Sequence, residues 1–128
     1  MKHYDDIEAD DSFDMGVEWM QLGNLDKALI YLNRAIDLNP KFIYAYIALS
    51  RLFARQNKFS EAIQILKRAS RVDPSFDRLP YLMAKYAYKN GDFKQSLQCI
   101  DRALAINDTE LYEQARSIME RGFRGRDR

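Results

Sequence analysis

The stretch LGNLDKALIYLNRAIDLNP, residues 22–40, decides the fold, because the chain repeats its pattern twice at a fixed spacing. A shift of 34 residues places it on QNKFSEAIQILKRASRVDP (56–74), and a second equal shift places it on NGDFKQSLQCIDRALAIND (90–108). No insertion is needed to keep the three stretches in register. Self-similarity at a period of about 20–50 residues is typical of stacked repeat architectures. We therefore expect one compact unit built from stacked repeats.

Each copy predicts a helix with one buried face. In the first copy, apolar residues recur every three or four positions from Leu25 to Leu38, which is the stripe of a half-buried helix. The same spacing holds over 59–72 and 93–106. A second periodic stretch precedes each copy, at 13–21, 43–55 and 79–89. These six stretches predict three helix–turn–helix pairs and an all-α fold.

The turn inside each pair carries a residue that tolerates a left-handed backbone. Gly23, Asn57 and Gly91 share one register, and glycine or asparagine is common just after the end of a helix for this reason. The first two copies then end in Asn-Pro (39–40) and Asp-Pro (73–74). The residue before a proline is pushed out of the helical region, so each second helix is expected to end there.

Small residues occupy one register on the first helices and another on the second helices. The set is Gly16, Ser50 and Ala84, followed by Ala28, Ala62 and Ser96. We expect paired helices to approach each other closely at these positions, because a large side chain there would overpack the interface.

This pattern resembles the tetratricopeptide repeat (TPR) family. The residues that match the family's motif in the first repeat are Gly16, Trp19, Gly23, Ala28, Leu32, Ala35 and Pro40. The resemblance implies a TPR α-solenoid with repeats at 9–42, 43–76 and 77–110. The chain departs from the motif at Ser12, Pro80, Ala87 and Asp108, although Pro80 falls in the first turn of its helix, where proline is tolerated.

The two ends of the chain carry opposite charge. Residues 1–14 have a net charge of −5 and residues 116–128 a net charge of +3. We expect an acidic tail over 1–8, a helix over 111–124 that covers the open end of the solenoid, and a basic tail over 125–128. Asp108 or Thr109 is positioned to cap that last helix.

Composition favours a soluble, folded protein without catalytic chemistry. Hydrophobic residues make up 47% and charged residues 30% of the chain, and the net charge is only +1. Cys99 is the only cysteine and His3 the only histidine, so no histidine lies within the repeats to serve as a base for a nucleophile. No phosphate-binding loop or metal motif is present, and no apolar run is long enough to cross a bilayer. We expect a cytoplasmic, non-enzymatic protein without cofactor or metal.

The TPR resemblance implies that the first helix of each pair lines a concave groove that holds a partner segment. Helical projection gives the candidate partner-binding residues: Phe13, Val17, Met20, Tyr44, Ile47, Arg51, Arg55, Arg78, Tyr81, Lys85, Tyr88, Lys89, Tyr112 and Arg116. Basic side chains and tyrosines dominate the set, and no acidic residue of the repeats after Asp14 is expected to face the groove.

These side chains predict a protein or peptide partner with acidic and apolar residues, because arginine forms charge-assisted bonds to carboxylates and tyrosine offers amphipathic contact area. Adaptor, co-chaperone and assembly factor are all compatible roles. Two alternatives stay open. The acidic N-terminus of one copy could occupy the basic groove of another, giving a self-assembling scaffold. The basic and tyrosine-rich face could also bind single-stranded RNA, which the near-zero net charge disfavours.

One known TPR mode of binding is not reproduced. Some chaperone-binding TPR proteins hold a partner's terminal carboxylates with a clamp of Lys, Asn, Asn, Lys and Arg. Here Phe13 and Val17 stand at the first two positions, Arg51 replaces the second Asn, and Leu82 replaces the last Arg, while Arg78 keeps a basic character. Binding to the C-termini of heat-shock chaperones is therefore not expected.

Overall fold

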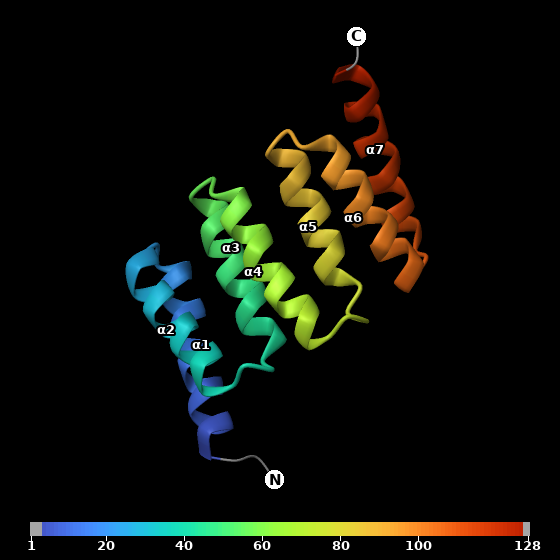
Figure 1. Ribbon diagram of the computed structural model, residues 1–128. Coiled ribbons are helices and arrows are strands. Elements are labelled where there is room, and N and C mark those ends of the chain that lie inside the picture. Colours follow the sequence, from blue (N-terminus) through green and yellow to red (C-terminus); the bar gives the residue numbers. More distant parts are fainter. Residues whose placement is uncertain (1–3, 127–128) are drawn as a thin grey trace.

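Between residues 4 and 126, the computed structural model forms seven α-helices and no strand (Figure 1). It describes the backbone of these residues and the side chains of residues 7–125. The helices are α1 (Tyr4–Gln21), α2 (Leu25–Leu38), α3 (Ile43–Arg55), α4 (Phe59–Val72), α5 (Arg78–Lys89), α6 (Phe93–Ile106) and α7 (Glu110–Arg126). The all-α prediction is confirmed.

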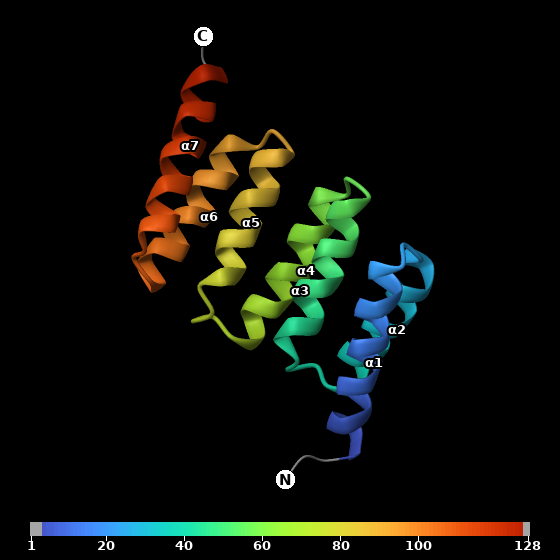
Figure 2. The same ribbon diagram turned by 180° about the vertical axis from the view of Figure 1, so that it is seen from behind.

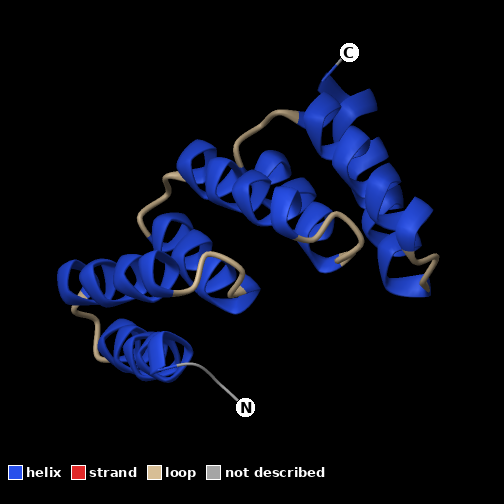
Figure 3. Cartoon of the chain, turned by 60° about the horizontal axis from the view of Figure 1, so that its bottom comes forward, coloured by secondary structure: helices blue, strands red, loops and turns tan. Residues whose placement is uncertain are grey.

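The helices form consecutive pairs that stack in a row. The closest packing joins α1 to α2, α3 to α4 and α5 to α6, and each pair then contacts the next through α2–α3, α4–α5 and α6–α7. Opposite views show the pairs following one another along the molecule (Figures 1 and 2). Successive pairs are also rotated relative to one another (Figure 3). This is the α-solenoid expected from the 34-residue period.

The turn within each pair adopts the left-handed backbone that the sequence predicts. The φ angles are +84° at Gly23, +60° at Asn57 and +81° at Gly91. In each turn, an amide donates back to a carbonyl near the end of the first helix, as Asp92 N does to the Ala87 oxygen at 2.9 Å. Such bonds satisfy carbonyl groups that the helix end leaves without a partner.

Replacing Gly91 with alanine is expected to lower the free energy of unfolding by about 1 kcal/mol, because an L-residue is strained in the left-handed region. A Cβ atom at Gly91 would meet no heavy atom within 4 Å, so the backbone alone sets this cost. Gly125 lies in α7 with equally open space and without that φ angle, so Gly125→Ala is the matched control. Urea unfolding of both variants measures the difference, and equal stability of the two would contradict the explanation.

The small residues lie where the sequence places them, at close contacts between paired helices. A Cβ atom added at Gly16 would stand 2.7 Å from the Leu32 side chain, so α1 and α2 approach too closely for any larger residue. Ala62 is fully buried. Ser96 is also fully buried and donates to the Ala84 carbonyl oxygen at 2.8 Å, which satisfies its hydroxyl inside the core.

Both ends are more helical than expected. Helix α1 begins at Tyr4, inside the range 1–8 expected as a tail, and α7 runs to Arg126, beyond the expected bounds 111–124. Thr109 caps α7, since its Oγ1 accepts from the Tyr112 amide at 3.2 Å. Carboxylates favour the positive end of a helix dipole, so the acidic start of α1 extends the helix. Residues 1–3 and 127–128, including His3, lie outside the described residues.

Helix α7 covers the last repeat as predicted. Tyr112 and Met119 of α7 are each only 6% exposed. None of the helices in the described part of the chain has the length and apolar character needed to span a bilayer.

Candidate functional site

A hollow of about 410 Å³ lies between α1 and α3 and reaches α5. Phe13 and Val17 of α1 and Ile47 of α3 give it an apolar lining. Phe13 is held by a tilted contact with Phe42, at 5.0 Å between ring centres. Tyr44 stands at its edge with 55% of its surface exposed. This space, here called the main hollow, offers a partner an apolar surface beside polar edges.

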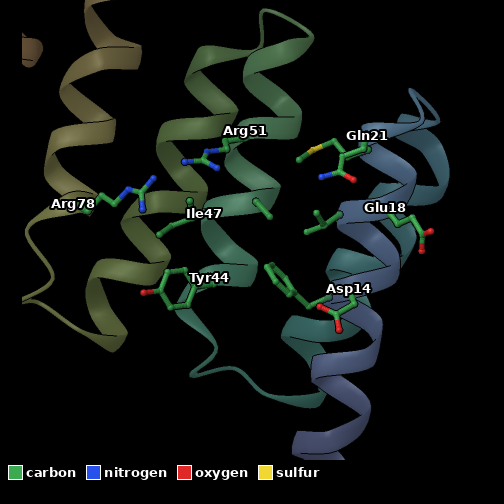
Figure 4. Close-up of a pocket in the computed structure, with 11 residues that line it drawn as sticks. Asp14, Glu18, Gln21, Tyr44, Ile47, Arg51 and Arg78 are labelled. Atoms are coloured by element: carbon green, nitrogen blue, oxygen red, sulfur yellow. The ribbon is translucent and has the colours of Figure 1, made fainter.

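The polar edges of the main hollow carry opposite charges. Arg51 and Arg78 come from α3 and α5, whereas Asp14 comes from α1 on the other side (Figure 4). Glu18 is also among the lining residues, but its side chain points away from α3 (Figure 4). The expectation that no acidic residue after Asp14 faces the groove therefore stays a prediction.

The side chains of the two arginines in the main hollow differ from those of Arg116 and Arg124. Within residues 7–125, neither Arg51 nor Arg78 forms an ion pair or a hydrogen bond. In contrast, Arg116 is 2.8 Å from Asp101, and Arg124 is 2.8 Å from Glu120. The donors of Arg51 and Arg78 are thus available to a ligand.

A second hollow, of about 510 Å³, continues the first toward α5 and is basic. Met20 and Arg51 belong to both hollows, and Arg55, Lys85 and Lys89 join them in the second. Arg55 is partly engaged, because its guanidinium donates to the Met20 carbonyl oxygen at 2.7 Å. That bond ties the second repeat to the C-terminal end of α1, where the Met20 oxygen also accepts from the Gly23 amide at 3.1 Å. We call this space the basic hollow.

A third space, of about 170 Å³, lies between α5 and α7 and is mainly apolar. Tyr81 and Tyr88 line it from α5, and Ile118 and Met119 from α7. Its remaining lining residues are Lys85, Lys89 and Ala115. We call it the apolar slot.

Twelve of the fourteen candidate residues therefore line one of these three connected spaces, and Tyr112 and Arg116 do not. Tyr112 is buried, stacks on Tyr81 at 5.0 Å between ring centres, and donates its hydroxyl to Asp77. Arg116 bonds to Asp101 of α6 and to Glu120. Both side chains hold α7 in place.

Burial and the hydrogen bond to the Asp77 carboxylate raise the pKa of Tyr112 to about 12, from a usual value of 10. The folded chain therefore keeps the phenol proton at a pH where the unfolded chain has lost it. This contribution to stability is complete below pH 10 and disappears between pH 10 and about 12.

We expect the free energy of unfolding to fall more gently between pH 10 and 12 in Tyr112→Phe than in the wild type, because the variant lacks this ionisation. Urea titrations at several pH values measure the slope. Asp77→Asn, which removes the carboxylate but keeps the phenol, should give an intermediate slope. Identical slopes in the wild type and Tyr112→Phe would contradict the assignment.

Sequence reasoning missed Glu18 and the α7 wall of the apolar slot, formed by Ala115, Ile118 and Met119. The sequence predicts only that the last helix covers the end of the solenoid, not that it shares a cavity with α5. Among the described residues, no group of three His, Cys, Asp or Glu side chains is placed to hold a metal ion.

Comparison with known proteins agrees with the repeat architecture. The family model described as "Tetratricopeptide repeat" matches residues 20–86 and again 54–121. Superkiller protein 3 of Schizosaccharomyces pombe is 26% identical over 97 residues, which are 76% of this chain and 7% of that protein. The chain spans only 7–28% of the length of the curated relatives it matches.

Two solved structures share the shape at low sequence identity. The N-terminal domain of stress-induced protein-1 from C. elegans has a TM-score of 0.87 at 18% identity, covering 93% of this chain and 99% of that one. The first TPR of Spaghetti (RPAP3), bound to the HSP90 peptide SRMEEVD, has a TM-score of 0.81 at 13% identity, covering 92% and 97%. With the family model matching most of its length, the chain belongs to the tetratricopeptide repeat family.

Proposed function

We propose that this chain is a non-catalytic protein–protein interaction module, acting as an adaptor, co-chaperone or assembly factor, and that its inner face holds an acidic and apolar segment of a partner protein. One observation carries the proposal. The main hollow combines an apolar lining with two arginines, Arg51 and Arg78, that form no ion pair or hydrogen bond within residues 7–125.

Because the two sides of the main hollow carry opposite charges, they favour one orientation of the bound partner segment. Carboxylates of the segment would bond to Arg51 and Arg78, because guanidinium forms strong charge-assisted bonds to carboxylate. Asp14 across the hollow would accept from an amide group or a cationic side chain. Apolar residues of the segment would cover Phe13 and Ile47, which supplies affinity through the burial of apolar surface.

A structural relative supports a peptide ligand of this class. The RPAP3 domain of similar shape is bound to SRMEEVD, a peptide that contains both acidic and apolar residues. The shared shape makes a peptide-sized ligand reasonable for this chain, but Phe13, Val17 and Leu82 still depart from the clamp that holds chaperone tails. We therefore propose an internal segment of a partner rather than a chaperone C-terminus.

The same hollow argues against RNA as the ligand. Asp14 lines it together with Arg51 and Arg78, so phosphates entering it would also meet a carboxylate. Like charges placed opposite each other oppose binding and suppress wrong partners. A steep loss of affinity for single-stranded RNA with rising salt is the result that would favour the RNA alternative.

Self-assembly is the second candidate, because the outer side of α1 exposes apolar residues among acids. Ile7 is 49% and Met15 39% exposed, and Asp11 lies between them on the same helix. The basic hollow of another copy offers complementary charge. Since these residues belong to α1 rather than to a tail, substitution tests the idea better than truncation. Sedimentation of Ile7→Ser/Asp11→Lys should show smaller oligomers than the wild type; equal sizes would exclude this mode.

Selection from a library of random displayed peptides tests the proposed function. We expect the wild type to enrich peptides in which carboxylates neighbour aromatic or aliphatic residues, and their binding to weaken at high salt because exposed charge pairs are screened. Enrichment of basic peptides, or the absence of any enrichment, would overturn the proposal.

A further inference from the structure

We infer that the apolar slot is a second anchoring subsite, which takes one aromatic or aliphatic side chain of the partner segment. The segment would then carry two apolar anchors separated by acidic residues. This inference rests on the proposed function, and it adds the α7 end of the chain to the recognition surface.

The apolar slot has the size of a single side chain. Its volume is about 170 Å³, and a cavity of about 150 Å³ is known to hold a benzene ring. Ile118, one of its walls, leaves 47% of its surface exposed although it stands beside Tyr88 and Met119. An apolar side chain inserted here would cover that exposed surface, which favours binding.

The walls of the apolar slot are fixed before any ligand arrives. Tyr88 meets Phe93 edge-on at 5.1 Å between ring centres, and Tyr81 stacks on the buried Tyr112. A Cβ atom at Gly122 would stand 2.8 Å from the Tyr88 ring, so α7 lies directly against that tyrosine. A site with preset walls avoids the entropy cost of ordering side chains on binding.

The charges at the rim identify what must accompany the apolar anchor. Lys85 and Lys89 line both the apolar slot and the basic hollow. They lie one turn apart on α5, and neither forms an ion pair within residues 7–125. Carboxylates next to the anchor in sequence would meet these two ammonium groups.

The three spaces form one continuous path along the inner face. Met20 and Arg51 are shared by the main and basic hollows, and Lys85 and Lys89 by the basic hollow and the apolar slot. A segment following the path would meet an apolar surface, then basic groups, then a second apolar surface. Two helix spacings of at least about 10 Å each correspond to about six or more residues of extended chain.

The test compares peptides selected from a random displayed library, long enough to cross the inner face, by the wild type and by Ile118→Ser. We expect wild-type peptides to carry two apolar residues about six or more positions apart with acidic residues between them. Ile118→Ser should select peptides with only one apolar anchor. Replacing the second anchor of a wild-type peptide with serine should weaken binding about ten-fold or more to the wild type, and hardly at all to Ile118→Ser.

Leu111→Ser is the matched control, since Leu111 is an aliphatic residue of α7 that is 56% exposed and does not line the apolar slot. It should select the wild-type pattern, and its melting temperature reports any general effect on α7. The same two-anchor pattern from Ile118→Ser would overturn the subsite while the proposed function stands. Selected peptides that bind Arg51→Glu/Arg78→Glu as well as the wild type would instead overturn the proposed function.

Discussion

Replacing Leu66 with alanine is expected to lower the free energy of unfolding by about 2–5 kcal/mol, the cost of deleting a buried leucine side chain and leaving a cavity. Leu66 is fully buried in α4, the helix that packs against both α3 and α5. In a repeat protein, stability depends on the contacts between neighbouring repeats, so damage to the middle repeat weakens both interfaces.

Denaturant unfolding followed by circular dichroism measures this loss. Leu22→Ala is the matched control, because Leu22 is 70% exposed and its replacement should change stability by no more than about 0.5 kcal/mol. An equal loss of free energy in both variants would contradict the packing of Leu66 in the core between α4 and its neighbouring helices.

Reversing two charges in the main hollow is expected to have the largest effect on binding. Arg51→Glu/Arg78→Glu should weaken the affinity for a selected acidic peptide about 100-fold or more. The variant loses two charge-assisted interactions and adds repulsion against the peptide's carboxylates, and about 3 kcal/mol corresponds to that factor. Titration calorimetry of both proteins with one peptide gives the ratio directly.

The control must make the same change of charge elsewhere. Arg71 of α4 and Lys94 of α6 are exposed, and neither lines the three spaces of the inner face. Arg71→Glu/Lys94→Glu should therefore keep most of the affinity, apart from the small long-range effect of net charge. An equal loss in both double variants would point to non-specific attraction.

The 34-residue period was sufficient to predict the repeat fold, because each matched residue has a local physical role. Gly23 and Asn57 could be assigned to left-handed turns from residue type and position, and their φ angles agree. Gly16 could be assigned to a close contact, and the Leu32 side chain lies where a larger residue would be placed. Turn chemistry and helix periodicity are properties of short stretches, so sequence alone carries them.

The candidate site was predicted less completely, because it depends on contacts between distant segments. Helical projection indicates which face of a helix a residue occupies. It does not indicate which of several nearby groups a long side chain bonds to. Arg55 reaches the Met20 carbonyl oxygen, and Arg116 reaches Asp101 on another helix. The apolar slot exists only because α7 lies against Tyr88 at Gly122, and the repeat pattern, which ends before α7, does not specify that contact.

The central claim is that the inner face of the solenoid binds the partner segment, and amide NMR spectra with and without a selected acidic peptide test it most directly. We predict that the largest chemical-shift changes fall on α1, α3 and α5, at residues such as Val17, Ile47 and Lys85. Changes concentrated on α2, α4 and α6, with the residues of the three spaces unaffected, would contradict the account.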